Sequence, residues 1–230
     1  MITVTYNAAD MLERTLRSIE AQRYAEMETI IVDGKSKDGT VDIIRKHEGA
    51  VSKWVSEPDG GIYDAMNKGV RMASGEWIIF MNAGDTFAGD DVLERIFSTK
   101  QDADIIYGDV VKGGNVKKAP EKYHPYHRML FCHQSSLTRR KLLLDCPFDT
   151  SHRLSADLKF FLTQYFRKAR FHYVGFPIAD FDTTGVSNSR RSAGLSDNMR
   201  VISETVPMPR RLAFLLRLMV PYVICKIRGK

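Results

Sequence analysis

Three carboxylates stand at positions where a carboxylate can do chemistry. Asp33 and Asp85 follow the apolar runs of two expected strands, and Asp157 opens an expected helix. Ligands of open α/β sheets bind at the carboxyl ends of the strands, so Asp33 is expected to contact the base or ribose of a nucleotide. Asp85 is expected to hold a hard divalent cation, whose other ligands are commonly water and phosphate oxygens. Together they predict group transfer from a nucleotide-activated donor, in which the cation neutralises the leaving diphosphate and a separate carboxylate deprotonates the incoming hydroxyl.

Strands and helices alternate in the first half of the chain. Apolar runs predict strands at 1–5, 28–33, 53–56 and 77–81, and helical spacing predicts helices at 9–22 and 62–73. This order is typical of an α/β fold with a Rossmann-like, mostly parallel sheet flanked by helices. The run Trp77–Met81 is apolar without alternation, which indicates a strand buried on both faces near the centre of the sheet. Residues 1–110 are therefore predicted to form the half of a single domain that binds the nucleotide-activated donor.

The second half, residues 111–204, follows a looser pattern. Strands are expected at 104–111, 133–137 and 171–176, and Ser155 is expected to open a helix with Asp157 in its first turn. The positive end of that helix would stabilise the Asp157 anion. The polar segment 112–126 is expected to be a mobile excursion, and the polar loop 182–189 is expected to close over a site. This half is predicted to bind the acceptor and to supply the catalytic base.

The net charge of the chain comes from its last residues. The whole sequence carries a formal charge of +6, and the segment from Thr205 to the end has six basic residues and no acidic one. The neutral remainder counts against a general nucleic-acid-binding surface. Three cysteines without a C-x-x-C pair predict neither a disulfide framework nor a zinc site, so a reducing compartment is expected. The chain does not begin with a basic leader and an apolar core, so no signal peptide is expected.

Residues 205–230 are predicted to form a basic amphipathic helix. Arg217 and Pro221 interrupt its apolar blocks, and no uncharged run approaches the ~18 residues of a membrane-spanning helix. Such a helix would lie in the membrane interface, which predicts a cytoplasmic protein held peripherally on the inner face of the cell membrane. The alternatives are that the helix packs on the body of the protein or against a second copy of the chain in a homo-oligomer.

Four ordered motifs carry a resemblance to a known family. They are ITVTYN at 2–7, IVDGKSKDGT at 31–40, SEPDGGIYDAMNKG at 56–69 and GEWIIFMNAGD at 75–85. Together they resemble the family-2 glycosyltransferases of GT-A fold, closely up to Asp85 and loosely to about Ser189. Bacterial exopolysaccharide and O-antigen synthesis enzymes belong to that group. The resemblance implies inverting transfer of a sugar from a nucleotide-sugar donor to a saccharide or lipid-linked saccharide acceptor, with Mg²⁺ or Mn²⁺.

The resemblance also implies roles for individual residues. Nucleotide-sugar contacts are implied for Thr5, Asn7, Asp33, Asp64, Arg71, Asn82 and Asp85. Asp85 matches the family's metal-binding Asp, and Asp157 sits where the family has its catalytic base. The pair His133-Gln134 resembles a segment that faces the acceptor, and a purely structural histidine is an equally open alternative for His133.

The chain departs from the family at its acidic motif. That motif is commonly Asp-x-Asp-Asp, whereas Asn82 and Gly84 stand at its first two acidic positions here, which leaves Asn82 as a neutral partner for sugar or ribose. The loss keeps open a non-catalytic nucleotide-binding or scaffold subunit of a synthesis complex. For Asp33 and Asp38, in the loop after the second expected strand, the alternative is that they merely cap turns.

Two other nucleotide chemistries lack their signatures. A sugar-phosphate nucleotidyltransferase would need a Gly-rich, basic loop after the first strand, and residues 6–10 are not one. Neither a Walker loop nor a G-x-G-x-x-G after that strand is present, which counts against P-loop phosphoryl transfer and dinucleotide redox chemistry.

Overall fold

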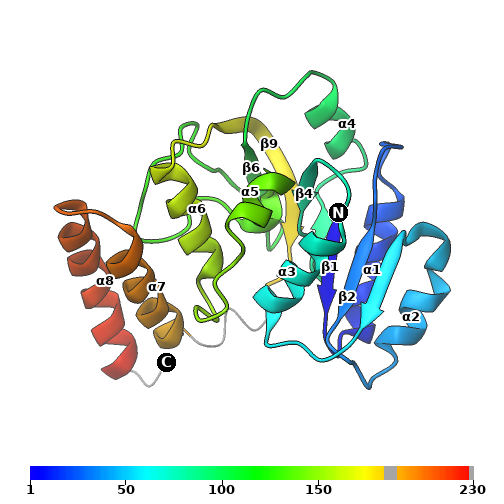
Figure 1. The fold of residues 1–230 in the computed structure, drawn as a ribbon, viewed down its shortest axis with the longest axis horizontal. Coiled ribbons are helices and arrows are strands. Elements are labelled where there is room, and N and C mark those ends of the chain that lie inside the picture. Colours follow the sequence, from blue (N-terminus) through cyan, green and yellow to red (C-terminus); the bar gives the residue numbers. More distant parts are fainter. Residues whose placement is uncertain (184–190, 228–230) are drawn as a thin grey trace.

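In the computed structural model, which describes residues 1–183 and 191–227, the apolar runs of the first half form three parallel strands. These strands, β1 (Ile2–Thr5), β2 (Ile30–Asp33) and β3 (Lys53–Ser56), lie in the order β3-β2-β1 (Figure 1). Their register places Thr5 beside Asp33 and Asp33 beside Ser56. The carboxyl ends of all three strands therefore meet at one edge of the sheet, which is where α/β folds bind ligands.

Helices connect these strands because parallel neighbours need a crossover. They are α1 (Ala9–Glu20), α2 (Thr40–Lys46) and α3 (Ile62–Met72). Apolar residues of α1 and α2 pack on one face of the sheet, and those of α3 pack on the other. The predicted amphipathic helices at 9–22 and 62–73 are confirmed to within two residues at each end.

The strand β4 (Trp77–Ile79) joins the two halves of the sheet. Phe80, which follows it, forms a parallel bridge with Ile2 of β1, and the amide of Met81 donates to the Ile2 carbonyl at 2.9 Å. On its other side β4 pairs antiparallel with β8. The predicted central position of this apolar run is confirmed, and the turn that follows it emerges at the ligand edge.

The second half of the sheet mixes strand directions. Its remaining strands are β5 (Thr86–Phe87), β6 (Ile105–Lys112), β7 (Asn115–Lys117), β8 (Ser136–Arg139) and β9 (Phe171–Phe181), and its helices are α4 (Val92–Phe97), α5 (Arg140–Asp145) and α6 (Ala156–Phe166). The order continues β4-β8-β6-β9-β5, with β7 beside β6. Neighbours here are antiparallel except for β6 and β9, so the parallel arrangement belongs to the first half. The boundary predicted at residue 110 falls inside β6, and this six-stranded sheet meets the three-stranded sheet of β1 to β3 where Phe80 bridges Ile2.

Helices cover both faces of this sheet, as Figure 1 shows. One apolar layer joins alternate strand residues such as Ile2 and Tyr107 to α3, α5 and α6. The other layer joins residues such as Ile31 and Ile106 to α1, α2 and α4. The predicted α/β fold is confirmed. The loops of the ligand edge leave strands that are packed between two apolar layers.

The C-terminal segment forms two helices that pack against α6. In α7 (Arg191–Thr205) and α8 (Arg210–Ile227), Val201, Ile202, Phe214 and Leu218 are buried with residues of α6. One face of the predicted tail helix therefore packs on the body of the protein, which was one of the alternatives. The opposite face of α8 is exposed. None of the helices within 1–183 and 191–227 has the length and apolar character needed to cross a membrane. The loop predicted at 182–189 lies mostly outside the described residues, as do Arg228 and Lys230.

Candidate active site

The polar groups after β1 and β2 bind one another. Asp33 is fully buried, and its carboxylate accepts hydrogen bonds from the Ser36 amide at 3.0 Å and the Ser56 hydroxyl at 2.6 Å. Asn7 has a positive φ of 47° and accepts from the Lys37 amide at 2.9 Å. Hydrogen bonds within the protein thus hold the loops after the two strands together. Asp33 caps the turn at Ser36, which was the alternative to a nucleotide contact in the sequence analysis.

The Asp38 carboxylate joins the starts of two helices, α1 and α2. Its carboxylate accepts from the amide of Ala9 at the start of α1 and from the amide of Thr40 at the start of α2, both at 3.1 Å. Thr5 differs from these satisfied groups, since its Oγ1 is buried and has no hydrogen-bond partner among the described residues. Buried polar atoms are seldom left unpaired, so Thr5 Oγ1 marks a place for a ligand or water at this edge.

The two residues predicted from α3 lie at opposite ends of it. Asp64 is in the first turn and accepts from the Gly60 amide at 2.9 Å, so it faces the ligand edge. Arg71 is in the last turn, about 10 Å further along the helix axis. Its neighbour Met72 accepts at 3.0 Å from Lys53, which begins β3. The structure therefore places Arg71 toward the opposite edge of the sheet from Asp64, and its implied contact with the nucleotide stays a prediction.

The turn after β4 is shaped by a glycine and a threonine. Gly84 has a φ of +103°, and a Cβ there would lie 2.8 Å from Oδ2 of Asp182. The Thr15 hydroxyl accepts from the Gly84 amide at 2.9 Å and donates to the Asp85 carbonyl at 2.8 Å. A larger residue at 84 would strain the backbone and displace Asp182. The glycine at this acidic-motif position therefore leaves room for a carboxylate from the end of β9.

Asp85 is buried at that turn and makes two hydrogen bonds. Its Oδ1 accepts from the Asp182 amide at 2.9 Å, and its Oδ2 accepts from Nε2 of Gln134 at 3.0 Å. Burial raises the pKa of the Asp85 carboxyl to about 6, although these hydrogen bonds and the charge of His133 act in the opposite direction. Gln134, expected to face the acceptor, is buried against Asp85 instead.

The oxygen atoms around Asp85 fit a hard divalent cation. The Asp182 carboxylate acts on Asp85 electrostatically, and Oδ1 of Asn82 is buried without a hydrogen-bond partner in the described chain. Carboxylate and amide oxygens are suitable ligands for Mg²⁺ or Mn²⁺. A cation held by Asp85, Asp182 and Asn82 would favour the ionised form of Asp85 and use the unpaired oxygen of Asn82. Asp182 was missed by the sequence analysis because it lies 97 residues from Asp85 and belongs to no recognisable motif.

Asp157 lies in the first turn of α6 and is held by groups from three segments. Its Oδ1 accepts from the Tyr63 hydroxyl at 2.9 Å and from the Leu158 amide at 2.8 Å, and its Oδ2 lies 3.3 Å from Nδ1 of His133. Burial alone would raise the pKa of the Asp157 carboxyl, but His133 and the two hydrogen-bond donors outweigh it and hold the pKa below its usual value. Asp157 is thus an anion with most of its acceptor positions occupied.

His133 and Gln134 connect the two carboxylates. The segment His133–Ser135 was predicted as a strand but forms one turn of 3₁₀ helix before β8, which turns consecutive side chains to different sides. His133 contacts Asp157 and Gln134 contacts Asp85, so one short turn spans both halves of the site. Nε2 of His133 is buried and has no partner among the described residues.

Tyr63 was not singled out from the sequence. It lies inside the third motif, one residue before Asp64, and is buried in the core. Burial and the neighbouring Asp157 raise its pKa well above the usual value, so it remains a hydrogen-bond donor. Its position in the third motif could have indicated a functional role. A tyrosine at helical spacing is equally typical of a residue that packs in the core.

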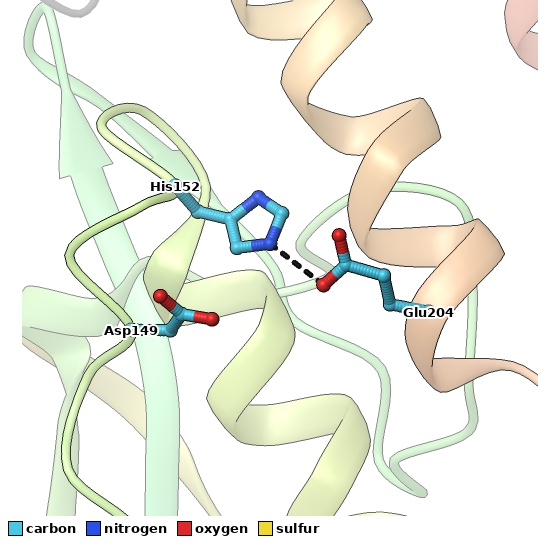
Figure 2. A group of neighbouring side chains, drawn as sticks. All are labelled: Asp149, His152 and Glu204. Atoms are coloured by element: carbon cyan, nitrogen blue, oxygen red, sulfur yellow. Dashed lines mark hydrogen bonds and ion pairs between the residues drawn. The ribbon is translucent and has the colours of Figure 1, made fainter.

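A second group of side chains lies close enough together to bind a metal ion, but a lysine already neutralises the charge of its carboxylates. Possible ligand atoms of Asp149, His152 and Glu204 lie within 4.8 Å of one another (Figure 2). The Lys159 ammonium is 2.6 Å from both carboxylates. His152 also contacts Asp197 of α7 at 2.8 Å. Lys159 follows Asp157 by two positions and so projects from another side of α6. A cation would have to replace Lys159, and the group acts as an ion-pair network that fixes α7 to α6.

Comparison of sequences identifies similar chains. Residues 1–170 match the sequence model of the family described as Glycosyl transferase family 2. The chain is 31% identical to an uncharacterized glycosyltransferase of Mycobacterium tuberculosis, over 87% of this chain and 80% of that one. It is 32% identical to a PGL/p-HBAD biosynthesis glycosyltransferase of Mycobacterium bovis, over 70% of this chain and 66% of the relative.

Comparison of structures gives the same fold. The mannosyltransferase PcManGT of Pyrobaculum calidifontis, solved in complex with GDP-Man and Mn²⁺, superposes with a TM-score of 0.70. The similarity covers 95% of this chain and 67% of that one at 17% sequence identity. The GT-A fold predicted from the four motifs is confirmed by this likeness.

Proposed function

The chain belongs to glycosyl transferase family 2, as its motifs predicted, and on that basis we propose that it transfers a sugar from a nucleotide-sugar to a hydroxyl acceptor with inversion. One observation carries the proposal: the turn His133–Ser135 brings Asp85 at the end of β4 and Asp157 at the start of α6 into one site. Inversion needs a group that stabilises the leaving diphosphate and a separate group that takes the acceptor's proton, and the two carboxylates supply these separately.

The donor is proposed to bind at the ligand edge of β1 to β4. Thr5 Oγ1 and Asn82 Oδ1 are buried polar atoms in need of partners, and Asn7, Asp33 and Asp64 line the loops beside them. The relative PcManGT was solved with a nucleotide-sugar and Mn²⁺. A divalent cation bound by Asp85, Asp182 and Asn82 would neutralise charge on the departing diphosphate. Arg71 is left out of this site because α3 carries it to the far edge.

The acceptor is proposed to enter beside Asp157, where the Asp157–His133 pair would receive its proton. A PGL/p-HBAD biosynthesis glycosyltransferase is among the relatives, which supports an acceptor used in glycolipid or polysaccharide synthesis. A lipid-linked saccharide is the form of acceptor that fits a protein held at a membrane surface.

The exposed face of α8 supports such membrane contact. Exposed apolar side chains on this helix are Leu212, Leu216, Met219, Val220, Val223, Ile224 and Ile227. They lie on one stripe, opposite the buried Phe214 and Leu218. Exposed basic residues, Arg210 and Arg217 on one side of the stripe and Lys226 on the other, match the charge of anionic lipids. We therefore place the protein peripherally on a cytoplasmic membrane face, with α8 in the interface.

A thermal-shift screen tests the donor site without knowledge of the acceptor. UDP, GDP, dTDP and CDP are each added with Mn²⁺, Mg²⁺ or EDTA, because a ligand that binds only the native state raises the melting temperature. The proposal expects a cation-dependent shift with one nucleotide and its loss in Asp85→Asn. Asp145→Asn, an exposed carboxylate on α5, is the matched control. Cooperative melting without any shift would favour the scaffold alternative instead.

A further inference from the structure

A cavity of about 580 Å³ lies between the last turn of α6, the first residue of β9 and the first residue of α8. We infer that this cavity, here called the α8 cavity, binds the phosphate group of an anionic lipid. It lies about 13 Å along the axis of α6 from Asp157, so it is separate from the proposed active site. The inference rests on the proposed membrane contact of α8 and adds to it a site that recognises one chemical group.

Aromatic side chains form the walls of the α8 cavity. The ring of Tyr123 stacks on the ring of Phe171, with centroids 4.2 Å apart, and meets the ring of Tyr165 edge-on at 5.8 Å. The loop that carries Tyr123 is also tied to β6, because the Tyr107 hydroxyl donates a hydrogen bond to the Pro120 carbonyl at 2.7 Å. Contacts within the protein therefore fix the shape of the cavity.

Three basic residues line the α8 cavity, and each comes from a different segment. They are Lys122 in the loop after β7, Lys168 after α6 and Arg210 at the start of α8. None of the three forms an ion pair with a residue in the described ranges 1–183 and 191–227. Glu121 is the one acidic residue among the described residues that line the cavity, so the lining is net positive. Arg170, two residues after Lys168, differs because it is paired with two aspartates.

A phosphate group suits this arrangement of charge. Ammonium and guanidinium groups donate charge-assisted hydrogen bonds to phosphate oxygens, and a guanidinium can bind two of these oxygens at once. An anion between the three basic side chains would reduce their mutual repulsion. Because the basic side chains come from different segments, the anion would also join the start of α8 to the end of α6.

Lys168 occupies a backbone position that favours glycine. Its φ is 63°, its amide donates to the Tyr165 carbonyl at 2.9 Å, and the amide of Ala169 donates to the Gln164 carbonyl at 3.0 Å. These are the two hydrogen bonds of a Schellman cap, whose left-handed residue is usually glycine. A lysine is therefore less favourable there than glycine, but it supplies an ammonium group to the cavity. The structural alternative is that this cation only stabilises the end of α6.

The surroundings of Arg210 favour a lipid over a free phosphate. Met208 and Leu212, two residues to either side of Arg210, are 64% and 54% exposed, and Leu212 begins the exposed apolar stripe of α8. The acyl chains of a lipid whose phosphate lies in the α8 cavity would cover these apolar side chains, whereas a free phosphate would leave them in water. Basic and exposed apolar side chains at one place are typical of a site in the membrane interface.

Dihexanoyl phosphatidic acid, kept below its micellar concentration, tests the site without a membrane surface. We expect calorimetry with the full chain to detect its binding. In Lys168→Gly the affinity should fall by about 10-fold or more, because a hydrogen bond to a charged group is lost. The melting temperature of Lys168→Gly should stay the same or rise, since glycine suits the left-handed position.

The matched control is Arg167→Gln. Arg167 is exposed next to Lys168, and it does not line the α8 cavity. Its loss removes the same charge, and the affinity for dihexanoyl phosphatidic acid should stay within about 2-fold of the unaltered protein. Lys122→Gln leaves the cap of α6 intact and should weaken binding as Lys168→Gly does. Unchanged affinity in both Lys122→Gln and Lys168→Gly would remove the cavity from lipid binding.

Two other compounds identify the group that is recognised. Inorganic phosphate should bind more weakly than dihexanoyl phosphatidic acid, because it lacks the acyl chains that would cover the apolar side chains. Dihexanoyl phosphatidylcholine, which has no net charge, should also bind more weakly. Equal affinity for inorganic phosphate would mean that the cavity binds any phosphate, and equal affinity for the choline lipid would mean that charge is not recognised. Either result would overturn the inference.

Sedimentation with vesicles of phosphatidic acid and phosphatidylcholine tests the same site at a membrane. Lys168→Gly should bind these vesicles less than Arg167→Gln does, although each variant loses one positive charge and general attraction to the surface would affect both equally. Equal binding of the two variants would assign the contact to surface charge and contradict the inference. No nucleotide-sugar enters these measurements, so failure of the proposed sugar transfer would leave their result unchanged.

Discussion

The two sides of the site are assembled in different ways. On the donor side, Asp33 binds Ser36 and Ser56, and Asn7 binds the loop after β2, so contacts form among neighbouring parallel strands and their loops. On the catalytic side, Asp157 meets Tyr63 from 94 residues away. The proposed cation site, which serves the donor, also depends on a distant contact, since Asp85 meets the Asp182 amide from 97 residues away. The donor side, here called the donor cradle, consists of the loops after β1 to β4 and is held by local contacts. The catalytic side forms only when distant elements pack together. Changes in the first should affect binding, and changes in the second should affect turnover or the stability of the assembled site.

Asp157→Asn should have the largest effect. Removing the carboxylate that is proposed to take the acceptor's proton should lower the rate of nucleoside diphosphate release by about 10³-fold, within the range found for acid–base groups. Nucleotide affinity should not change, because Asp157 is on the catalytic side. The rate is measured with saturating donor and compared with Asp145→Asn, whose carboxylate is exposed on α5. Full activity in Asp157→Asn would remove this residue from the mechanism.

Asp85→Asn tests the cost of the buried charge. The folded-state pKa of about 6 lies above the unfolded value near 3.8, so the folded protein binds a proton more tightly than the unfolded chain. Stability from this group is therefore present at about pH 4 and is lost as the pH rises through 6, by about 3 kcal/mol in all. Urea unfolding in EDTA at pH 4.5 and 7.5 covers about 2 kcal/mol of this loss, which should appear in the unaltered protein and not in Asp85→Asn.

Added Mn²⁺ should restore stability at pH 7.5 in the unaltered protein, since a bound cation favours the ionised carboxylate. Equal pH dependence of the two proteins in EDTA would mean that Asp85 is not the group whose burial is unfavourable when charged.

Leu216→Glu should weaken binding to anionic vesicles by about 10-fold or more, because burying a leucine side chain contributes roughly 1.5–3 kcal/mol. Sedimentation with vesicles of phosphatidylglycerol and phosphatidylcholine measures the bound fraction. Val116→Glu is the matched control, since Val116 is an exposed apolar residue on β7 far along the chain from α8. Equal binding of all three proteins would indicate that the α8 face meets protein instead of lipid.

The smallest effect is expected for Arg71→Ala. Its place at the far end of α3 predicts nucleotide affinity within about 2-fold of the unaltered protein, which calorimetry can measure. A larger loss of nucleotide affinity would mean that the donor extends to the opposite edge of the sheet. It would contradict the proposal that the donor binds at the loops after β1 to β4.

The sequence predicted what depends on local pattern. Strand-end positions of Asp33 and Asp85 follow from apolar runs, and the helix start at Asp157 follows from its spacing and cap. The partners of these residues could not be predicted, because Tyr63, Gln134 and Asp182 reach the carboxylates through the packing of distant elements. The nucleotide contact of Arg71 stays a prediction, and its position in the last turn of α3 is the feature that Arg71→Ala tests. The strand directions of the second half could not be predicted, because an apolar run shows where a strand lies and not which way its neighbours run.

The most direct test of the account is nucleotide binding and turnover measured together in three proteins: the unaltered chain, Asp85→Asn and Asp157→Asn. Calorimetry with Mn²⁺ and the nucleotide found by thermal shift gives affinity, and donor hydrolysis gives rate. The account predicts that Asp157→Asn keeps affinity and loses turnover, while Asp85→Asn loses both. Unchanged affinity in Asp85→Asn, or lost affinity in Asp157→Asn, would contradict the division between a donor cradle with its cation and a separate catalytic side.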